Sequence, residues 1–381
     1  MVVVELRYKN NFMGEIRPLT GFRFLAAFYV FIFHVDLPFR TPLSWLPFVV
    51  QKFIHNGQLG VTIFFVLSGF VLTHSYVNDF AQGEIKSFTY WGQFMFKRLA
   101  RIYPVFLVGM LLFTLVSILI NRLPPFYIPL LSAAFVQTYF PALSMSWYDS
   151  GAWSVANEMF FYLLFPLALP LAMRLRSRTA LLIGLVLSGF LGTALNLWAW
   201  RGTPFVQDAY ALCFSFPPVR FTEFVAGIIA ALLVIKFAWR TNPWAALLLC
   251  IFAIAFLIIV PPLGITVGRA NWIVLLAIAG LISAMTAYPN HKLFKWMGSD
   301  SMRYLGRISY AFYIAQLPLL CILDWLVASH RVSSTNIWVL PVGLILNLLA
   351  GASLHRFVEI PAHRWLIAWR KNRPAAVTIT A

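Results

Sequence analysis

The chain has 381 residues, of which 61% are hydrophobic and only 11% are charged, and its mean hydropathy is +0.81. A soluble globular protein carries about 25% charged residues, so this composition excludes a water-soluble fold of that length. The 29 Lys and Arg residues outnumber the 12 Asp and Glu residues, which gives a net charge of +17. In a soluble protein such a charge would indicate binding to nucleic acid. Here the hydropathy indicates a polytopic protein of the lipid bilayer, and no nucleic-acid partner is expected.

The hydrophobic runs predict an all-α membrane helix bundle of about ten transmembrane helices, because a bilayer core needs about 20 mostly apolar residues per helix. The expected spans are 19–36, 57–76, 102–121, 153–173, 179–200, 221–239, 244–262, 270–288, 308–327 and 336–358. A further apolar segment, 126–140, is too short for a span and contains Gln137.

The distribution of basic residues predicts the orientation of the bundle. With ten spans and a cytoplasmic N-terminus, 21 Lys and Arg residues fall in cytoplasmic segments and 7 in outer ones, in agreement with the positive-inside rule. An additional span at 126–140 would reverse the bias in every later loop, so this segment is expected to be re-entrant or interfacial. Both termini are therefore expected in the cytoplasm, with an N-terminal segment at 1–18, a transmembrane domain at 19–358 and a C-terminal tail at 359–381.

The chain shows no pattern for a metal site or a processed leader. Its three cysteines, Cys213, Cys250 and Cys321, lie in apolar runs, and no Cys/His spacing indicates zinc or a disulfide framework. The first residues do not resemble a signal peptide, so the first helix is expected to be retained.

Two ionisable residues in the first span indicate function, because such groups are costly inside a membrane. Arg23 and His34 are eleven residues apart, which in a helix places them on one face and about 16 Å apart along the axis. The alternative is that Arg23 extends to inner headgroups while His34 caps the outer end of the helix.

The fourth and sixth spans carry further charges. Glu158 lies in the outermost turns of the fourth span, at the level predicted for His34, and a buried carboxylate needs such a partner. Arg220 and Glu223 share one face of the sixth span at its outer end, either near an acceptor, together with Trp153, or as a local ion pair that holds the helix end.

The cytoplasmic side has its own polar residues. Arg98 and Arg101 point the same way at the start of the third span, and arginine is well suited to phosphate recognition. Positive-inside anchoring is the alternative. Ser68 lies past the midpoint of the second span, where small residues also serve helix packing. The pattern is suited to a phosphate-bearing donor inside and an acceptor near the outer surface.

Seven motifs, in order, resemble acyltransferase family 3, the bacterial membrane O-acyltransferases. They are RPLTGFRFLAAFYVFIFH, LGVTIFFVLSGFVLTHSY, FKRLARIYPVF, WSVANEMFFYLLFP, RFTEFVAG, LGRISYAFYIAQLP and VEIPAHRWL. The resemblance covers about residues 14–370. It implies an integral protein of the bacterial cytoplasmic (inner) membrane that transfers an acyl group, usually acetyl, from cytoplasmic acyl-CoA to a sugar hydroxyl of a surface or exported glycan, with no metal.

The resemblance also implies roles for single residues. His34 is then the essential histidine and Arg23 its motif partner, Arg98 and Arg101 belong to the acyl-CoA side, and Glu158 fills the acidic position. Many relatives have a histidine shortly before the proline of the AFYIAQLP segment, whereas this chain has Gln316 there. His34 as general base and an acyl-imidazole at His34 both remain open.

Two other functions remain as alternatives. A secondary transporter also carries intramembrane charges, but the chain lacks two halves with corresponding broken helices. His74 and Asp79 have the His-x4-Asp spacing of glycerolipid acyltransferases, although that motif belongs on a domain at the membrane face. The identity of the acceptor and the oligomeric state are not predicted.

Overall fold

The structure is a computed structural model that describes residues 14–36, 43, 45–81, 88–144, 149–202, 206–259, 266–333 and 336–371. Within these residues the chain is helical and contains no strand. The first half comprises α1 (Arg17–Asp36), α2 (Phe48–His55), α3 (Leu59–Ala81), α4 (Phe88–Leu119), α5 (Tyr127–Ala133), η2 (Gln137–Tyr139), α6 (Pro141–Ser144), α7 (Asp149–Met173) and α8 (Arg178–Gly202). The second half comprises α9 (Val206–Ser215), α10 (Pro217–Phe237), α11 (Pro243–Ile259), α12 (Thr266–Arg269), α13 (Asn271–Ala287), α14 (Asp300–Ala328), α15 (Val339–Leu354), η3 (His355–Glu359) and α16 (Ile360–Lys371).

The prediction of a polytopic helical membrane bundle is confirmed. In the described part of the chain, eight helices are long and apolar enough to cross a bilayer, and two more apolar helices, α11 and α13, have 17 residues each. Each of the ten predicted spans overlaps one of these helices. The segment 126–140 forms α5 and η2, which are too short to cross a bilayer. Its interfacial position and the cytoplasmic location of the termini stay predictions.

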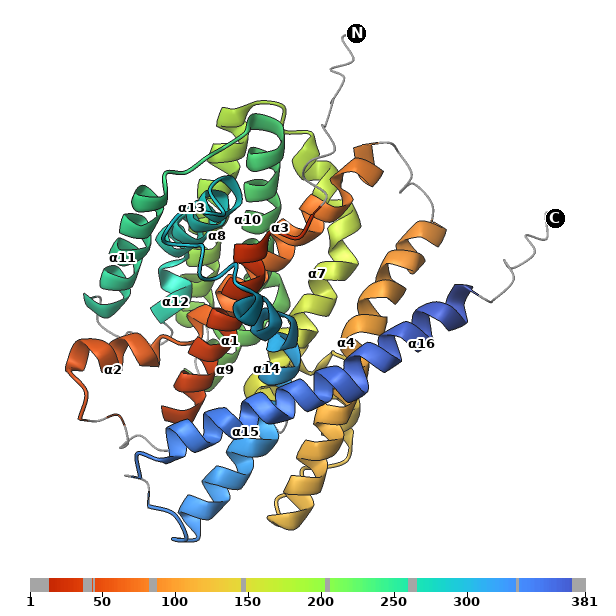
Figure 1. Cartoon of the computed structure of the whole chain (residues 1–381), viewed down its shortest axis with the longest axis vertical. Helices are drawn as coiled ribbons and strands as arrows, with labels where there is room; N and C mark the ends of the chain where they lie inside the picture. The colour runs from red at the N-terminus through yellow and green to blue at the C-terminus, as the bar shows by residue number, and fades with distance from the viewer. Residues whose placement is uncertain are drawn as a thin grey trace, which may run out of the picture.

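One predicted boundary is wrong, and the start of the expected C-terminal tail is helical. The third span was expected to begin at residue 102, but α4 begins at Phe88 and continues through Pro104. Arg98 and Arg101 therefore lie inside a long helix and not at its start. At the other end of the chain, the expected tail starts at the last residue of η3, Glu359, and continues as α16. The elements α15, η3 and α16 form one rod that crosses the bundle and packs against α4 (Figure 1). A π-helical turn, η3, accommodates the change of register within the rod.

The centre of the bundle is formed by α1, α3, α10 and α14 (Figure 1). Glycines allow the two closest helix pairs, because a Cβ at Gly69 of α3 would meet the Phe224 carbonyl of α10, and a Cβ at Gly306 of α14 would meet the Thr20 carbonyl of α1. In a membrane, where lipid is as apolar as the side chains, helices associate through this kind of close packing. The pairing brings α1 and α14 alongside each other over most of their length.

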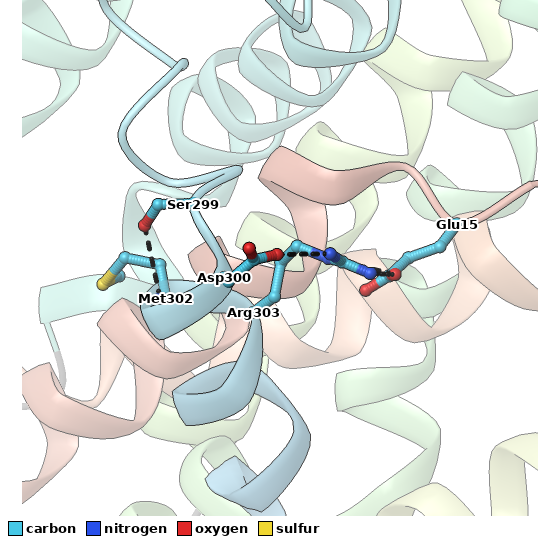
Figure 2. Close-up of polar contacts among 5 residues, drawn as sticks. All are labelled: Glu15, Ser299, Asp300, Met302 and Arg303. Carbon is cyan, nitrogen blue, oxygen red and sulfur yellow. Dashed lines mark hydrogen bonds and ion pairs between the residues drawn. The ribbon is translucent and has the colours of Figure 1, made fainter.

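A charged cluster holds the segment before α1 against the start of α14 (Figure 2). Arg303 donates from Nε to Glu15 at 3.1 Å and from Nη1 to Asp300 at 2.8 Å. The Ser299 hydroxyl caps α14 by accepting from the backbone N–H of Met302. The guanidinium also holds the pKa of Glu15 below its ordinary value, because the hydrogen bond from Arg303 favours the ionised carboxylate.

Candidate active site

Five of the nine predicted site residues line one cavity of about 90 Å³. They come from four helices: α1 provides Arg23, α3 provides Ser68, α4 provides Arg98 and Arg101, and α7 provides Glu158. The helix α14 packs against both α1 and α4 and adds Tyr310 and Tyr313 to the lining of the cavity. Charged and hydroxyl groups that are distant in the sequence thus meet at one cavity inside the bundle, beside apolar side chains.

Glu158 is the acidic group of this cavity, and its partners differ from the expected one. The Tyr162 hydroxyl, one turn along α7, donates to Glu158 Oε2 at 3.3 Å, and the Ser68 hydroxyl donates to the Tyr162 hydroxyl at 3.4 Å. Arg23 interacts electrostatically with Glu158 from α1. A cation and a phenol are partners of the kind that a buried carboxyl group requires. Tyr162 was missed by the sequence analysis, although the i, i+4 spacing from Glu158 indicates the contact.

Arg98 is held between aromatic rings at the boundary of the cavity. Its Nη2 donates to the Tyr76 hydroxyl at 2.9 Å, and its guanidinium lies over the rings of Tyr76 and Phe94 at 5.3 and 5.5 Å. Its buried Nε has no hydrogen-bond partner among the described residues. The two rings restrict the guanidinium, and its Nε donor is available to a ligand.

A second, more open groove of about 600 Å³ meets the cavity at the same two arginines. Arg98 and Arg101 line both spaces, and Lys97, His363 and Arg364 add basic groups from α4 and α16. Glu359 of η3 is the acidic residue of this lining, and it accepts a 2.8 Å contact from His355. Basic groups therefore extend from an open groove to the cavity. The sequence pattern predicts a donor-binding role for the two arginines, whereas His363 and Arg364 join the groove only through the packing of α16 against α4.

His34 lies elsewhere on α1 and is not one of the described residues that line the cavity. Its Nδ1 is 3.0 Å from Oε1 of Gln316 on α14. The expectation that Glu158 orients His34 is therefore not supported, because Glu158 faces Arg23 and Tyr162. The expected separation of Arg23 and His34 along one helix holds, since α1 runs without a break from Arg17 to Asp36.

The residues expected on the acceptor side form a buried cluster. Arg220 Nη1 pairs with Glu223 Oε1 at 3.0 Å, and the two side chains are 3% and 0% exposed. Arg220 also donates to Thr62 at 3.2 Å and lies over the buried ring of Trp153 at 5.5 Å. This burial favours the local ion pair over contact with an acceptor.

The His-x4-Asp spacing does not form a site in this fold. His74 and Asp79 lie on the continuous helix α3, where five residues correspond to about 140° of rotation, so the two side chains point in different directions. Asp79 accepts a hydrogen bond from the Tyr90 hydroxyl at 2.6 Å. In the described part of the chain, no group of three or more His, Cys, Asp or Glu side chains could hold a metal ion.

Comparisons with known proteins show which family the chain resembles. A family model described as an acyltransferase domain matches residues 17–356. The chain is 26% identical over 390 residues to the acyltransferase MdmB of Streptomyces mycarofaciens, covering 94% of this chain and 93% of MdmB. It is 23% identical over 375 residues to the O-acetyltransferase OatA of Staphylococcus aureus, covering 91% of this chain and 57% of OatA. A putative O-acetyltransferase of Staphylococcus aureus strain COL is 21% identical over 392 residues, and 61% of its length is covered. No solved structure matches the chain.

Proposed function

This chain belongs to acyltransferase family 3 and is a multi-pass membrane acyltransferase, and on that premise we propose that it transfers an acyl group, usually acetyl, from cytoplasmic acyl-CoA to a sugar hydroxyl of a cell-surface or exported glycan. We place it in the bacterial cytoplasmic membrane. The chain spans about three fifths of its staphylococcal relatives, so its substrates and partners are inferred from its own residues.

One observation supports this proposal most strongly: Arg98 and Arg101 line both the open basic groove and the smaller cavity. Acyl-CoA has the corresponding shape, with phosphates at one end and a thioester at the end of a long arm. The phosphates would bind in the groove, where a guanidinium offers paired hydrogen bonds to a phosphate. The arm would enter the cavity past Arg98, towards Arg23 and Ser68.

In the proposed reaction, His34 acts as the general base. Its imidazole takes the proton of the acceptor hydroxyl, the hydroxyl oxygen bonds to the thioester carbonyl carbon, and the carbon–sulfur bond breaks. The CoA thiolate leaves and receives the proton from the imidazolium. Glu158 balances the charge of Arg23 in the cavity, and the acyl-imidazole route at His34 uses the same nitrogen as a nucleophile.

The donor site is tested by the double variant Arg98→Ala/Arg101→Ala. A charge-assisted hydrogen bond contributes about 1.5–3 kcal/mol, so each arginine is expected to contribute about 10- to 100-fold to affinity. We expect binding of acetyl-CoA to the purified protein to weaken by at least the smaller factor. Arg176→Ala removes the same charge from the exposed α7–α8 connection and serves as the control. Undiminished binding in the double variant would refute this donor site.

The base is tested by His34→Ala, with the exposed His330→Ala as the control. We expect His34→Ala to bind acetyl-CoA normally and to lose acyl transfer, measured as CoA thiol release and by mass spectrometry of glycans from cells with and without the protein. Wild-type transfer by His34→Ala would contradict both routes.

A further inference from the structure

His34 has a partner whose own position is fixed by the fold. Gln316 is 1% exposed and lies on α14, which packs along α1. Its Oε1 is 3.0 Å from His34 Nδ1, and its Nε2 donates to the backbone carbonyl of Ala27 at 3.4 Å. One amide thus joins the histidine to the backbone of its own helix.

The two ends of this amide are not interchangeable. The Ala27 carbonyl can only accept a hydrogen bond, so the amide nitrogen, which can only donate, must face it. The amide oxygen then faces His34, and an amide oxygen can only accept. The His34 nitrogen nearest to it must therefore carry a hydrogen, and a bare Nδ1 would place two lone pairs against each other.

We propose that Gln316 is a positioning residue that holds neutral His34 in the tautomer with hydrogen on Nδ1, so that Nε2 carries the reactive lone pair. The partner on one ring nitrogen decides the state of the other. This assignment rests on the proposed function: Nε2 is then the atom that takes the acceptor proton as the oxygen bonds to the thioester carbon and CoA thiolate leaves.

The position of Gln316 on α14 also relates His34 to the cavity. Tyr310 and Tyr313 line the cavity, and Gln316 follows at the next three-residue interval, where neighbouring side chains of a helix adjoin. The row of three residues leads along α14 from the cavity to His34. Gln316 therefore holds the imidazole where a thioester advancing beyond Tyr313 would arrive.

The tautomer can be measured without activity, by side-chain ¹⁵N NMR of the full chain labelled at histidine. The His34 signals are identified by their loss in His34→Ala and are read above about pH 8, where an unperturbed imidazole is neutral. We expect the Nδ1–H form to dominate. A net hydrogen bond corresponds to about a 2- to 10-fold population bias, so Gln316→Leu should lose a bias of that size.

Gln316→Glu is the conservative variant, because a carboxyl group still accepts from Nδ1 in either protonation state. It should keep the Nδ1–H form. Loss of that bias lowers the fraction of the Nδ1–H form by up to about twofold, so release of CoA from acetyl-CoA should fall by up to about twofold in kcat in Gln316→Leu, with KM for acetyl-CoA unchanged, and should recover in Gln316→Glu. The control is Asn347→Leu, which removes another buried amide that donates to α14, at the Phe312 carbonyl, 3.1 Å away.

Hydrogen on Nε2 in the wild-type protein would overturn the proposal, as would Gln316→Leu with the wild-type tautomer and kcat. Equal loss of kcat in Asn347→Leu and Gln316→Leu, with no change of tautomer in either, would show a structural effect only and would also overturn it. A wild-type protein that transfers no acyl group would refute the proposed function, while the tautomer measurement would still decide the positioning role.

Discussion

The buried ion pair of α10 offers a quantitative test of whether Arg220 and Glu223 support the fold or the reaction. At their separation of 3.0 Å, Coulomb's law with an effective dielectric constant of about 20 gives an attraction of about 5–6 kcal/mol. Removal from water costs each ion several kcal/mol, which offsets most of that gain. Replacement of one partner alone therefore leaves an uncompensated buried charge, and we expect Glu223→Gln to lose about 3–5 kcal/mol of unfolding free energy.

The double variant Arg220→Met/Glu223→Leu separates the two roles. It removes both charges at similar volume, so it should be more stable than Glu223→Gln, although Thr62 and Asn271 each lose a hydrogen-bond partner at about 1 kcal/mol. Unfolding free energies are measured by SDS titration in mixed micelles. CoA release and glycan acylation are measured on the same preparations.

The outcome is decided by comparing stability with activity. If the pair is structural, the double variant regains most of its stability and retains acyl transfer. A double variant as unstable as Glu223→Gln would refute the electrostatic reasoning. A stable double variant with no transfer would instead return Arg220 and Glu223 to the acceptor side.

Two further predictions concern the pairing of α1 with α14. Gly306→Ala should destabilise the bundle by about 1–3 kcal/mol, because its Cβ would meet the Thr20 carbonyl. The control is Gly343→Ala, which should be nearly neutral because its Cβ meets only side chains, at ordinary distances of 3.7 Å or more. Equal effects of the two variants in SDS titration would contradict this account. Glu15→Gln should lower the thermal stability in detergent at neutral pH. Because the pKa of Glu15 is held below its ordinary value of 4.5, its contribution is present above that value and is lost as the pH falls through the folded-state pKa. The difference from the wild-type protein should therefore shrink below about pH 4.5, and a pH-independent difference would rule out the Arg303 pair as its cause.

Several features of the site were accessible from the sequence because they depend on one helix at a time. Arg23 and His34 share a face of α1 through helix geometry alone, and Arg98 and Arg101 share a face of α4 for the same reason. The cost of burying charge in a membrane marked Glu158 as functional. These local rules do not say which faces of different helices meet.

The expected contact between Glu158 and His34 depends on this question. Glu158 and His34 were expected together because both lay near the outer ends of their spans, yet Arg23 and Tyr162 take the place beside Glu158 and Gln316 takes the place beside His34. Depth along a helix can be estimated from a sequence, but rotation about its axis depends on the packing partner. The basic groove was missed for a related reason, since α16 belongs to it only through its packing against α4.

The sequence by itself determined that this chain is a polytopic helical membrane protein, where its helices lie along the chain, and to which family it belongs, because hydropathy, helical period and motif order are properties of the chain alone. Only the tertiary structure decided how the polar residues divide. Close contacts at Gly69 and Gly306 set the rotation of α3 and α14. The packing of the helices brings five polar residues to one cavity, buries Arg220 with Glu223, and places the amide of Gln316 beside His34.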